Sequence, residues 1–356
     1  MRITFVLPGW SRKPIGGFKI IYEYANRLAV RGHEIVIVHP LIISCGRMRS
    51  SSKLKFVIKW IIYILLGIKK LKWFNVFHKV KLLIVPNLKE KFIPDGDIII
   101  ATANLTAECV HGYGTNKGKK FHLIQGYKKL GKEPEKIDKA WKFSLKKIVI
   151  SHWLEKEVLS IGEKVYGYVP NGIDFNRFHI ITPIEKRNPK NIGMCYDPTL
   201  WKGSKDGIEA LKIVKDRFPD INVTFFSIYK RTSEVPSWIN YFHNPPQHKI
   251  LEVYNSCGIF ISPSWTEGWG LPAGEAIACG CALAVTDSGG IRDFAINEKT
   301  ALVCPMRDPK ALARNTIRLI EDNGLRLRLA KHGNEFVRQF TWERAIENLE
   351  KIIFDK

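Results

Sequence analysis

Two glutamates, Glu267 and Glu275, are separated by seven residues in a stretch that also contains Gly268 and Gly270. Carboxylates accept hydrogen bonds from vicinal hydroxyls, which are the groups that a sugar presents. Glycines carry no side chain, so they let backbone amides approach a ligand closely. A carboxylate on each side of a glycine-rich loop therefore favours a site for a sugar-containing ligand.

The neighbouring elements place this stretch at the end of a strand. The apolar run 258–261 predicts a strand, and Pro272 is typical of the first turn of a helix, which would then contain Glu275. Parallel sheets bind ligands beyond the carboxyl ends of their strands, and the partly positive N-terminus of a helix suits a diphosphate. Without a ligand, Glu275 would complement the helix dipole and Glu267 would be a solvated loop residue.

Strand and helix patterns alternate in two blocks along the chain of 356 residues, which is longer than one hydrophobic core usually organises. The alternation predicts an α/β fold of two Rossmann-like domains with doubly wound parallel sheets, which leave a cleft between them. We expect the domains at 1–168 and 169–339, with a last helix in 340–356 that crosses back. The loop with Gly16 and Gly17 lacks the G-x-G-x-x-G pattern, so no dinucleotide cofactor is indicated.

Positive charge is concentrated in the first domain. Residues 1–168 contain 31 Lys and Arg against 12 Asp and Glu, a net charge of +19, whereas residues 169–356 contain 25 against 22, a net charge of +3. Such a surface attracts polyanions, so an anionic membrane and nucleic acid both fit the charge. Nucleic acid would need exposed aromatics in a solvated groove, and the apolar runs here are too continuous for one. No nucleic-acid partner is predicted.

The apolar run 56–66 lies within residues 35–89, which contain eleven Lys and Arg but no Asp or Glu. The run is shorter than the roughly 20 residues of a spanning helix. It is either a helix lying in a membrane interface or a buried helix with a basic edge. The charge favours the first, and thus contact with an anionic membrane through Lys53, Lys55, Lys59, Trp60, Lys69, Lys70 and Lys72.

The seven cysteines are scattered and have no zinc-finger spacing, which fits a reducing cytosol. We therefore expect a cytoplasmic protein that is held peripherally on the inner face of the cell membrane.

The run from Ser262 to Gly280 resembles the Glu-x7-Glu signature of the family 4 retaining glycosyltransferases, which have the GT-B fold. Weaker matches to this family are Gly16-Gly17, Arg31–Glu34, Val169–Asp174, Trp201–Gly203 and Ser288–Asp293. The resemblance implies transfer from a nucleotide sugar, bound by the second domain, to an acceptor bound by the first. It also implies retention of configuration, and we expect neither a metal nor another cofactor. A glycan or lipid-linked acceptor in cell-envelope polysaccharide or glycoconjugate synthesis would fit.

The resemblance also implies roles for single residues. Glu267 would contact the transferred sugar near the reacting carbon, and Glu275 would hold the ribose hydroxyls. The groups around the diphosphate would be Lys202, the Gly16-Gly17 loop, and the backbone amides around Gly268, Gly270 and Leu271. Lys202 would supply positive charge without a metal, as the departing diphosphate requires.

Two positions depart from the family pattern. Asp197 stands where the family often has an Arg, which leaves Lys205 as a candidate substitute, and Gln125 stands where it often has a His. Because Gln125 occupies the position of this His, it is our candidate catalytic residue of the first domain. It can hydrogen-bond a sugar hydroxyl but cannot act as a base. His111 and His122 lie nearby in the sequence. The departures support an alternative, a catalytically weak or non-enzymatic membrane- or polyanion-binding protein on a GT-B scaffold, but the intact set of Glu267, Glu275 and Lys202 argues against it. A sugar-nucleotide epimerase is a further alternative, which fits the basic first half poorly.

Overall fold

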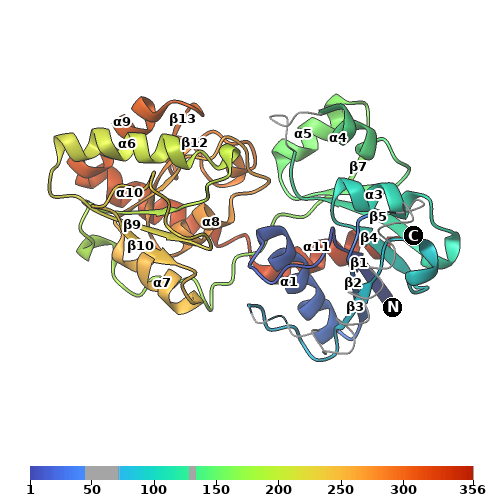
Figure 1. Cartoon of the computed structure of the whole chain (residues 1–356). Coiled ribbons are helices and arrows are strands. Elements are labelled where there is room, and N and C mark those ends of the chain that lie inside the picture. The colour runs from blue at the N-terminus through green and yellow to red at the C-terminus, as the bar shows by residue number, and fades with distance from the viewer. Residues whose placement is uncertain (45–70, 72, 128–133, 356) are drawn as a thin grey trace. The chain divides into compact units, whose positions relative to one another are not determined.

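The computed structural model describes residues 1–44, 71, 73–127 and 134–355, which form two compact units (Figure 1). The N-terminal unit consists of Met1–Ile150, Leu154–Val169 and Ile346–Lys356, and the C-terminal unit of Ser151–Trp153 and Pro170–Ala345. The end of the chain thus packs with the N-terminal unit, and the rest of the second half forms a unit of its own.

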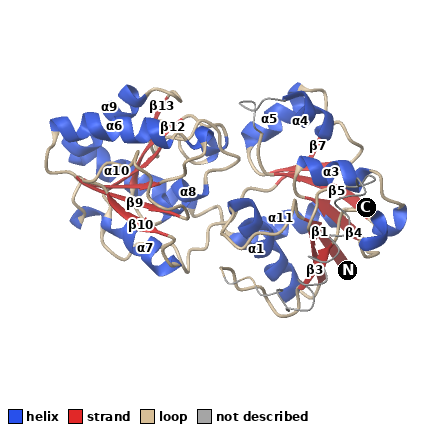
Figure 2. Ribbon diagram, viewed as in Figure 1, coloured by secondary structure: helices blue, strands red, loops and turns tan. Residues whose placement is uncertain are grey.

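The N-terminal unit contains a parallel sheet of seven strands in the order β3-β2-β1-β4-β5-β6-β7. Central strands are buried almost throughout, as all four residues of Ile98–Ala101 show, because helices cover both faces of the sheet (Figure 2). The strands are β1 (Arg2–Val6), β2 (Glu34–Pro40), β3 (Lys81–Val85), β4 (Ile98–Ala101), β5 (Lys119–Ile124), β6 (Lys146–Val149) and β7 (Val165–Tyr168).

The helices of this unit include the end of the chain. Helix α11 begins at Trp342, and its later turns pack on the N-terminal unit, where Glu350 Oε1 lies 3.1 Å from His33 Nε2. A side chain at Gly167 would collide with Ile352, so the glycine lets α11 lie against β7. Among the described residues, the helices that lie wholly or mostly in this unit are α1 (Gly16–Val30), α3 (Asn104–His111), α4 (Pro134–Trp141), α5 (His152–Ser160) and α11 (Trp342–Phe354).

The C-terminal unit contains a parallel sheet of six strands in the order β10-β9-β8-β11-β12-β13, again with helices on both faces. The strands are β8 (Asn191–Cys195), β9 (Asn222–Ser227), β10 (Asn240–His243), β11 (Ile259–Ser262), β12 (Ala282–Thr286) and β13 (Leu302–Cys304). The helices are α6 (Ser204–Arg217), α7 (Gln247–Ser256), α8 (Leu271–Ala278), α9 (Pro309–Glu321) and α10 (Asn323–Val337).

Both sheets reverse their winding at one point, between β1 and β4 in the N-terminal unit and between β8 and β11 in the C-terminal unit. Ligands of doubly wound sheets bind outside the carboxyl ends of the strands at this switch point. In the C-terminal unit, the loops that leave the switch point follow Cys195 and Ser262. The second of these loops is the stretch with Glu267 and Glu275.

The predicted α/β architecture of two doubly wound parallel sheets is confirmed. One local prediction was wrong: Gly16 and Gly17 belong to the first turn of α1 rather than to the loop before it, because the helix begins directly after Ile15. The apolar run 56–66 and the residues predicted for membrane contact, from Lys53 to Lys72, lie outside the described residues. Within the part of the chain that is described, no helix has the length and apolarity to cross a bilayer.

Candidate functional site

The loop after β8 carries Lys202, the last residue of the short 3-10 helix η4 (Leu200–Lys202). Gly203 follows in the left-handed region with φ 61°, and a Cβ there would lie 2.0 Å from the carbonyl oxygen of Pro263. Only glycine therefore lets this loop lie directly against the loop that leaves β11. The contact brings Lys202 to the switch point of the sheet.

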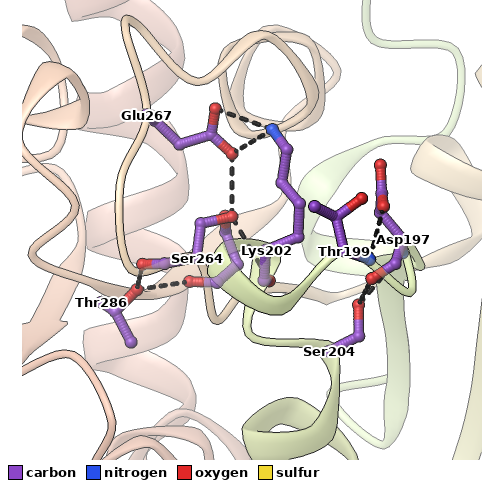
Figure 3. Close-up of polar contacts among 8 residues, drawn as sticks. Asp197, Thr199, Lys202, Ser204, Ser264, Glu267 and Thr286 are labelled. Carbon is purple, nitrogen blue, oxygen red and sulfur yellow. Dashed lines mark hydrogen bonds and ion pairs between the residues drawn. The ribbon is translucent and has the colours of Figure 1, made fainter. Parts of the chain in front are cut away.

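Lys202 forms an ion pair with Glu267 (Figure 3). Its Nζ lies 2.8 Å from Oε1 and 3.0 Å from Oε2 of the carboxylate. The hydroxyl of Ser264 donates a third hydrogen bond, of 2.8 Å, to Oε1. The Glu267 side chain is 13% exposed and that of Lys202 is 32% exposed, so solvent reaches the lysine more readily than the carboxylate.

The loop after β12 fixes the backbone at Glu267. The Glu267 N–H donates to the carbonyl of Ser288 at 2.8 Å, and the Gly290 N–H donates back to the carbonyl of Glu267 at 3.0 Å. A Cβ at Gly290 would lie 2.0 Å from the carbonyl oxygen of Gly268, so glycine is required there. The hydroxyl of Thr286 donates to the carbonyls of Ser262, the last residue of β11, and of Ser264 in the loop. The glutamate is thus held on both sides before any ligand arrives.

Glu275 lies one residue further into α8 than predicted, just past the first turn. The helix begins at Leu271, after Gly270 with φ 94°, so Glu275 is its fifth residue and the first turn contains no acidic side chain. The Tyr254 hydroxyl donates to Glu275 Oε2 at 3.2 Å. This placement weakens the interpretation of Glu275 as a residue that complements the helix dipole, because that effect falls off within the first turn.

Trp269 anchors the loop between the two glutamates. It is buried, with its ring centroid 4.8 Å from that of Phe294 and 5.5 Å from that of Phe340. Gly274 lies under this ring, because a Cβ there would come within 2.6 Å of it. The indole therefore ties the start of α8 to the core of the unit.

The electrostatics of the site favour the charged form of Lys202. Burial opposes that form, but the charge and hydrogen bonding of the Glu267 carboxylate outweigh it and raise the pKa of Lys202. Cys195, the last residue of β8, is affected by the same charges, and its burial raises the pKa of its thiol to about 12. At physiological pH, Lys202 is thus an ammonium and Cys195 a neutral thiol.

Asp197 and Lys205 have partners of their own. Asp197 Oδ1 accepts a hydrogen bond from the Thr199 N–H at 2.9 Å, and the Ser204 hydroxyl bonds the Asp197 N–H and carbonyl at 3.0 and 2.7 Å. Asp197 therefore shapes the loop that carries Lys202 (Figure 3). Lys205 forms a surface ion pair with Glu234 at 2.7 Å.

In the N-terminal unit, Gln125 and Gly17 lie together. The Gln125 Oε1 atom lies 3.5 Å from where a Cβ of Gly17 would be, and Gln125 Nε2 donates to the carbonyl of Thr102 at 3.3 Å. Thr102 directly follows β4, so this pair lies at the switch point of the first sheet. Gly16, at the start of α1, is exposed.

The two histidines near Gln125 have structural surroundings. His111 stacks on Phe143 with ring centroids 4.9 Å apart. His122 is buried in β5, where burial and the neighbouring Lys147 lower its pKa to about 3. A histidine that stays neutral in the core is no candidate for acid–base chemistry. Among the residues that the structure describes, no cluster of His, Cys, Asp and Glu could hold a metal ion.

Sequence reasoning missed Tyr254, Ser264 and Thr286, which hold the two glutamates or their loop. Ser264 had a weak signal, since it stands three residues before Glu267 at the end of a predicted strand. Tyr254 and Thr286 lie on other elements, and their spacing from Glu267 and Glu275 carries no pattern.

Comparison with known proteins agrees with this site. Residues 186–336, which contain Lys202, Glu267 and Glu275, match the family model of the glycosyl transferases group 1. The match covers less than half of the chain, and the recognition of a glycosyltransferase family from the Glu267–Glu275 stretch is confirmed.

Two curated relatives match shorter stretches. D-inositol 3-phosphate glycosyltransferase of Salinispora tropica is 33% identical over 107 residues, which are 30% of this chain and 22% of the relative. N,N'-diacetylbacillosaminyl-diphospho-undecaprenol alpha-1,3-N-acetylgalactosaminyltransferase of Campylobacter jejuni is 26% identical over 192 residues, which are 51% of this chain and 50% of the relative. The matched stretches thus span half or less of these relatives.

A solved structure covers the whole chain. HepE of Anabaena, crystallised in complex with UDP-glucose, aligns with a TM-score of 0.75 at 13% identity over 100% of both chains. At this identity the likeness shows the fold, and with it the predicted GT-B fold is confirmed.

The close contact at Gly203 generates a prediction. Gly203→Ala should lower the free energy of unfolding by about 2–4 kcal/mol, since it adds a clash with Pro263 to the cost of a left-handed alanine. The matched control is Gly270→Ala, which has the same left-handed backbone but whose Cβ would have no neighbour nearer than 3.7 Å. It should lose only about 1 kcal/mol in urea unfolding. Equal losses in the two variants would show that the contact with Pro263 is unimportant.

Proposed function

We propose that this protein is a glycosyltransferase that takes a sugar from a nucleotide-sugar donor bound in its C-terminal unit. The observation that carries the proposal is the Lys202–Glu267 pair at the carboxyl ends of β8 and β11, with Glu275 on the adjoining helix. The family of residues 186–336 supports it, and so does the crystallised complex of HepE with UDP-glucose.

Each side chain then has a chemical task. The nucleoside diphosphate gains negative charge as the glycosidic bond breaks, and Lys202 stabilises that charge together with backbone N–H groups from Gly268 to Leu271. Glu267 accepts hydrogen bonds from hydroxyls of the transferred sugar, and Glu275 from those of the ribose. This division is the one that the resemblance to the family implies, and it is supported by the places of Glu267 beside the cation and of Glu275 one turn into α8.

The N-terminal unit would bind the acceptor. Gln125 and the start of α1 at Gly16 and Gly17 lie at its switch point, and we propose that the glutamine amide bonds a sugar hydroxyl of the acceptor. We propose a glycan or lipid-linked acceptor in the synthesis of cell-envelope polysaccharide or glycoconjugates. The Campylobacter jejuni relative supports this choice, because its name includes a sugar linked to diphospho-undecaprenol.

Donor binding tests the central proposal. A thermal-shift panel of UDP-, GDP- and ADP-sugars should yield at least one stabilising donor. Glu275→Gln should weaken that donor by about 10- to 100-fold in calorimetry, because it removes a charged acceptor from the ribose. Glu185→Gln, at a surface ion pair with Lys331, is the matched control and should bind like the wild type. An unchanged Kd in Glu275→Gln would contradict the proposed ribose site.

The stereochemistry and the metal requirement share one experiment. We propose retention by a front-face displacement in which the leaving phosphate accepts the proton of the acceptor hydroxyl, with Lys202 in place of a metal. NMR of the product formed in EDTA should show the anomeric configuration of the donor. An inverted product or a trapped glycosyl-enzyme would contradict the displacement. Activity that EDTA abolishes and Mg²⁺ restores would contradict metal independence.

We also propose peripheral contact with an anionic membrane from the cytoplasmic side, supported by the charge of residues 1–168. The protein should float with vesicles that contain anionic lipid, less so in high salt, and not with neutral vesicles. Replacing the lysines from Lys53 to Lys72 by Gln should abolish flotation. The control replaces as many lysines of the C-terminal unit, Lys186, Lys212, Lys230, Lys249, Lys299 and Lys310. Equal flotation of the two variants would argue against the segment.

A further inference from the structure

Lys202, the cation that would bind the donor diphosphate, is already paired with Glu267. Both carboxylate oxygens of Glu267 contact Lys202 Nζ, at 2.8 and 3.0 Å. Two further cations, Lys205 of α6 and Arg292 of the segment after β12, are likewise paired, with Glu234 and Asp287. A diphosphate that enters this site must therefore compete with Glu267 for the lysine.

This competition costs more free energy at the Glu267 carboxylate than at the Lys202 ammonium. Lys202 would exchange one anion for another, but Glu267 would keep a single hydrogen bond, from Ser264. The Glu267 side chain is 13% exposed, so water replaces the lost ammonium poorly. A largely buried carboxylate that loses its partner is strongly destabilised.

An intact nucleotide sugar avoids this cost. Its sugar hydroxyls donate hydrogen bonds to the carboxylate at the moment when its diphosphate takes the lysine. A free nucleoside diphosphate has the same charged group but no sugar to offer. The nucleotide sugar thus gives the Glu267 carboxylate new hydrogen-bond donors, whereas the free diphosphate takes away its ammonium partner and offers none.

We propose that Glu267 is a specificity residue that holds Lys202 until a sugar replaces it, so that the site prefers the nucleotide sugar over the free nucleoside diphosphate. The inference rests on the proposed function and adds to it. After transfer the sugar has left, Glu267 takes Lys202 back, and the diphosphate product loses its cation. The same pair thereby favours donor entry and product release.

Glu267→Gln tests this directly, because it removes the charge and keeps the shape. We would measure the Kd of UDP and of UDP-glucose by calorimetry on the full chain, or of the GDP or ADP pair if the donor panel selects that base. The Kd of the free diphosphate should fall about three- to ten-fold, because Lys202 no longer has a competing anion. The Kd of the nucleotide sugar should stay the same or rise, since its hydroxyls lose a charged acceptor.

Three further variants make the result decisive. Lys202→Met should weaken both ligands, and Glu185→Gln should change neither. Glu267→Ala should lower the Kd of UDP, as Glu267→Gln should. It replaces Glu267→Gln in the test if that variant does not fold. If the wild type binds both ligands and neither Glu267 variant binds UDP more tightly, the inference is overturned while the proposed function stands. If the wild type binds no nucleotide or nucleotide sugar, both are wrong.

Discussion

The site depends on one close approach between two loops that leave neighbouring strands. β8 and β11 pair in register, with Ile261 opposite Met194, so their carboxyl ends lie side by side. At Gly203 the first loop comes so near Pro263 that a methyl group would not fit. The approach lets Lys202 reach Glu267. The hydrogen bonds from Ser264 to the carboxylate and from the Thr286 hydroxyl to the loop backbone then preserve that geometry.

The sequence indicated the chemistry of the site but not its pairing. Glu267, Glu275 and Lys202 could be selected because their residue types suit hydroxyls and phosphate, and because each lies beside a glycine or a helix start. The ion pair joins residues 65 positions apart, and it follows from a strand order that brings β8 beside β11. The hydrogen bond of Tyr254 to Glu275 likewise depends on packing between α7 and α8, which no spacing in the sequence shows.

Some elements leave only a weak pattern in the sequence, for two physical reasons. β7 and β10 are short strands at the edges of their sheets, and most of their side chains are half-buried or exposed. They therefore lack the continuous apolar run that marked the central strands. The helices α3, α4 and α5 have eight or nine residues, which is too short for helical periodicity to stand out.

The proposed role of Glu267 gives the negative charge at the site a physical purpose. A chain with a net charge of +22 attracts polyanions, including phosphates that carry no sugar. An unpaired lysine at a helix start would bind them readily and block the donor. When the lysine is paired with a carboxylate, a phosphate ligand binds it well only if the ligand also has sugar hydroxyls that donate to the carboxylate. Binding at Lys202 then depends on the neutral part of the ligand. Both ligands offer the same charged group to Lys202. The site therefore distinguishes the nucleotide sugar from the free nucleoside diphosphate by whether the Glu267 carboxylate is left unpaired.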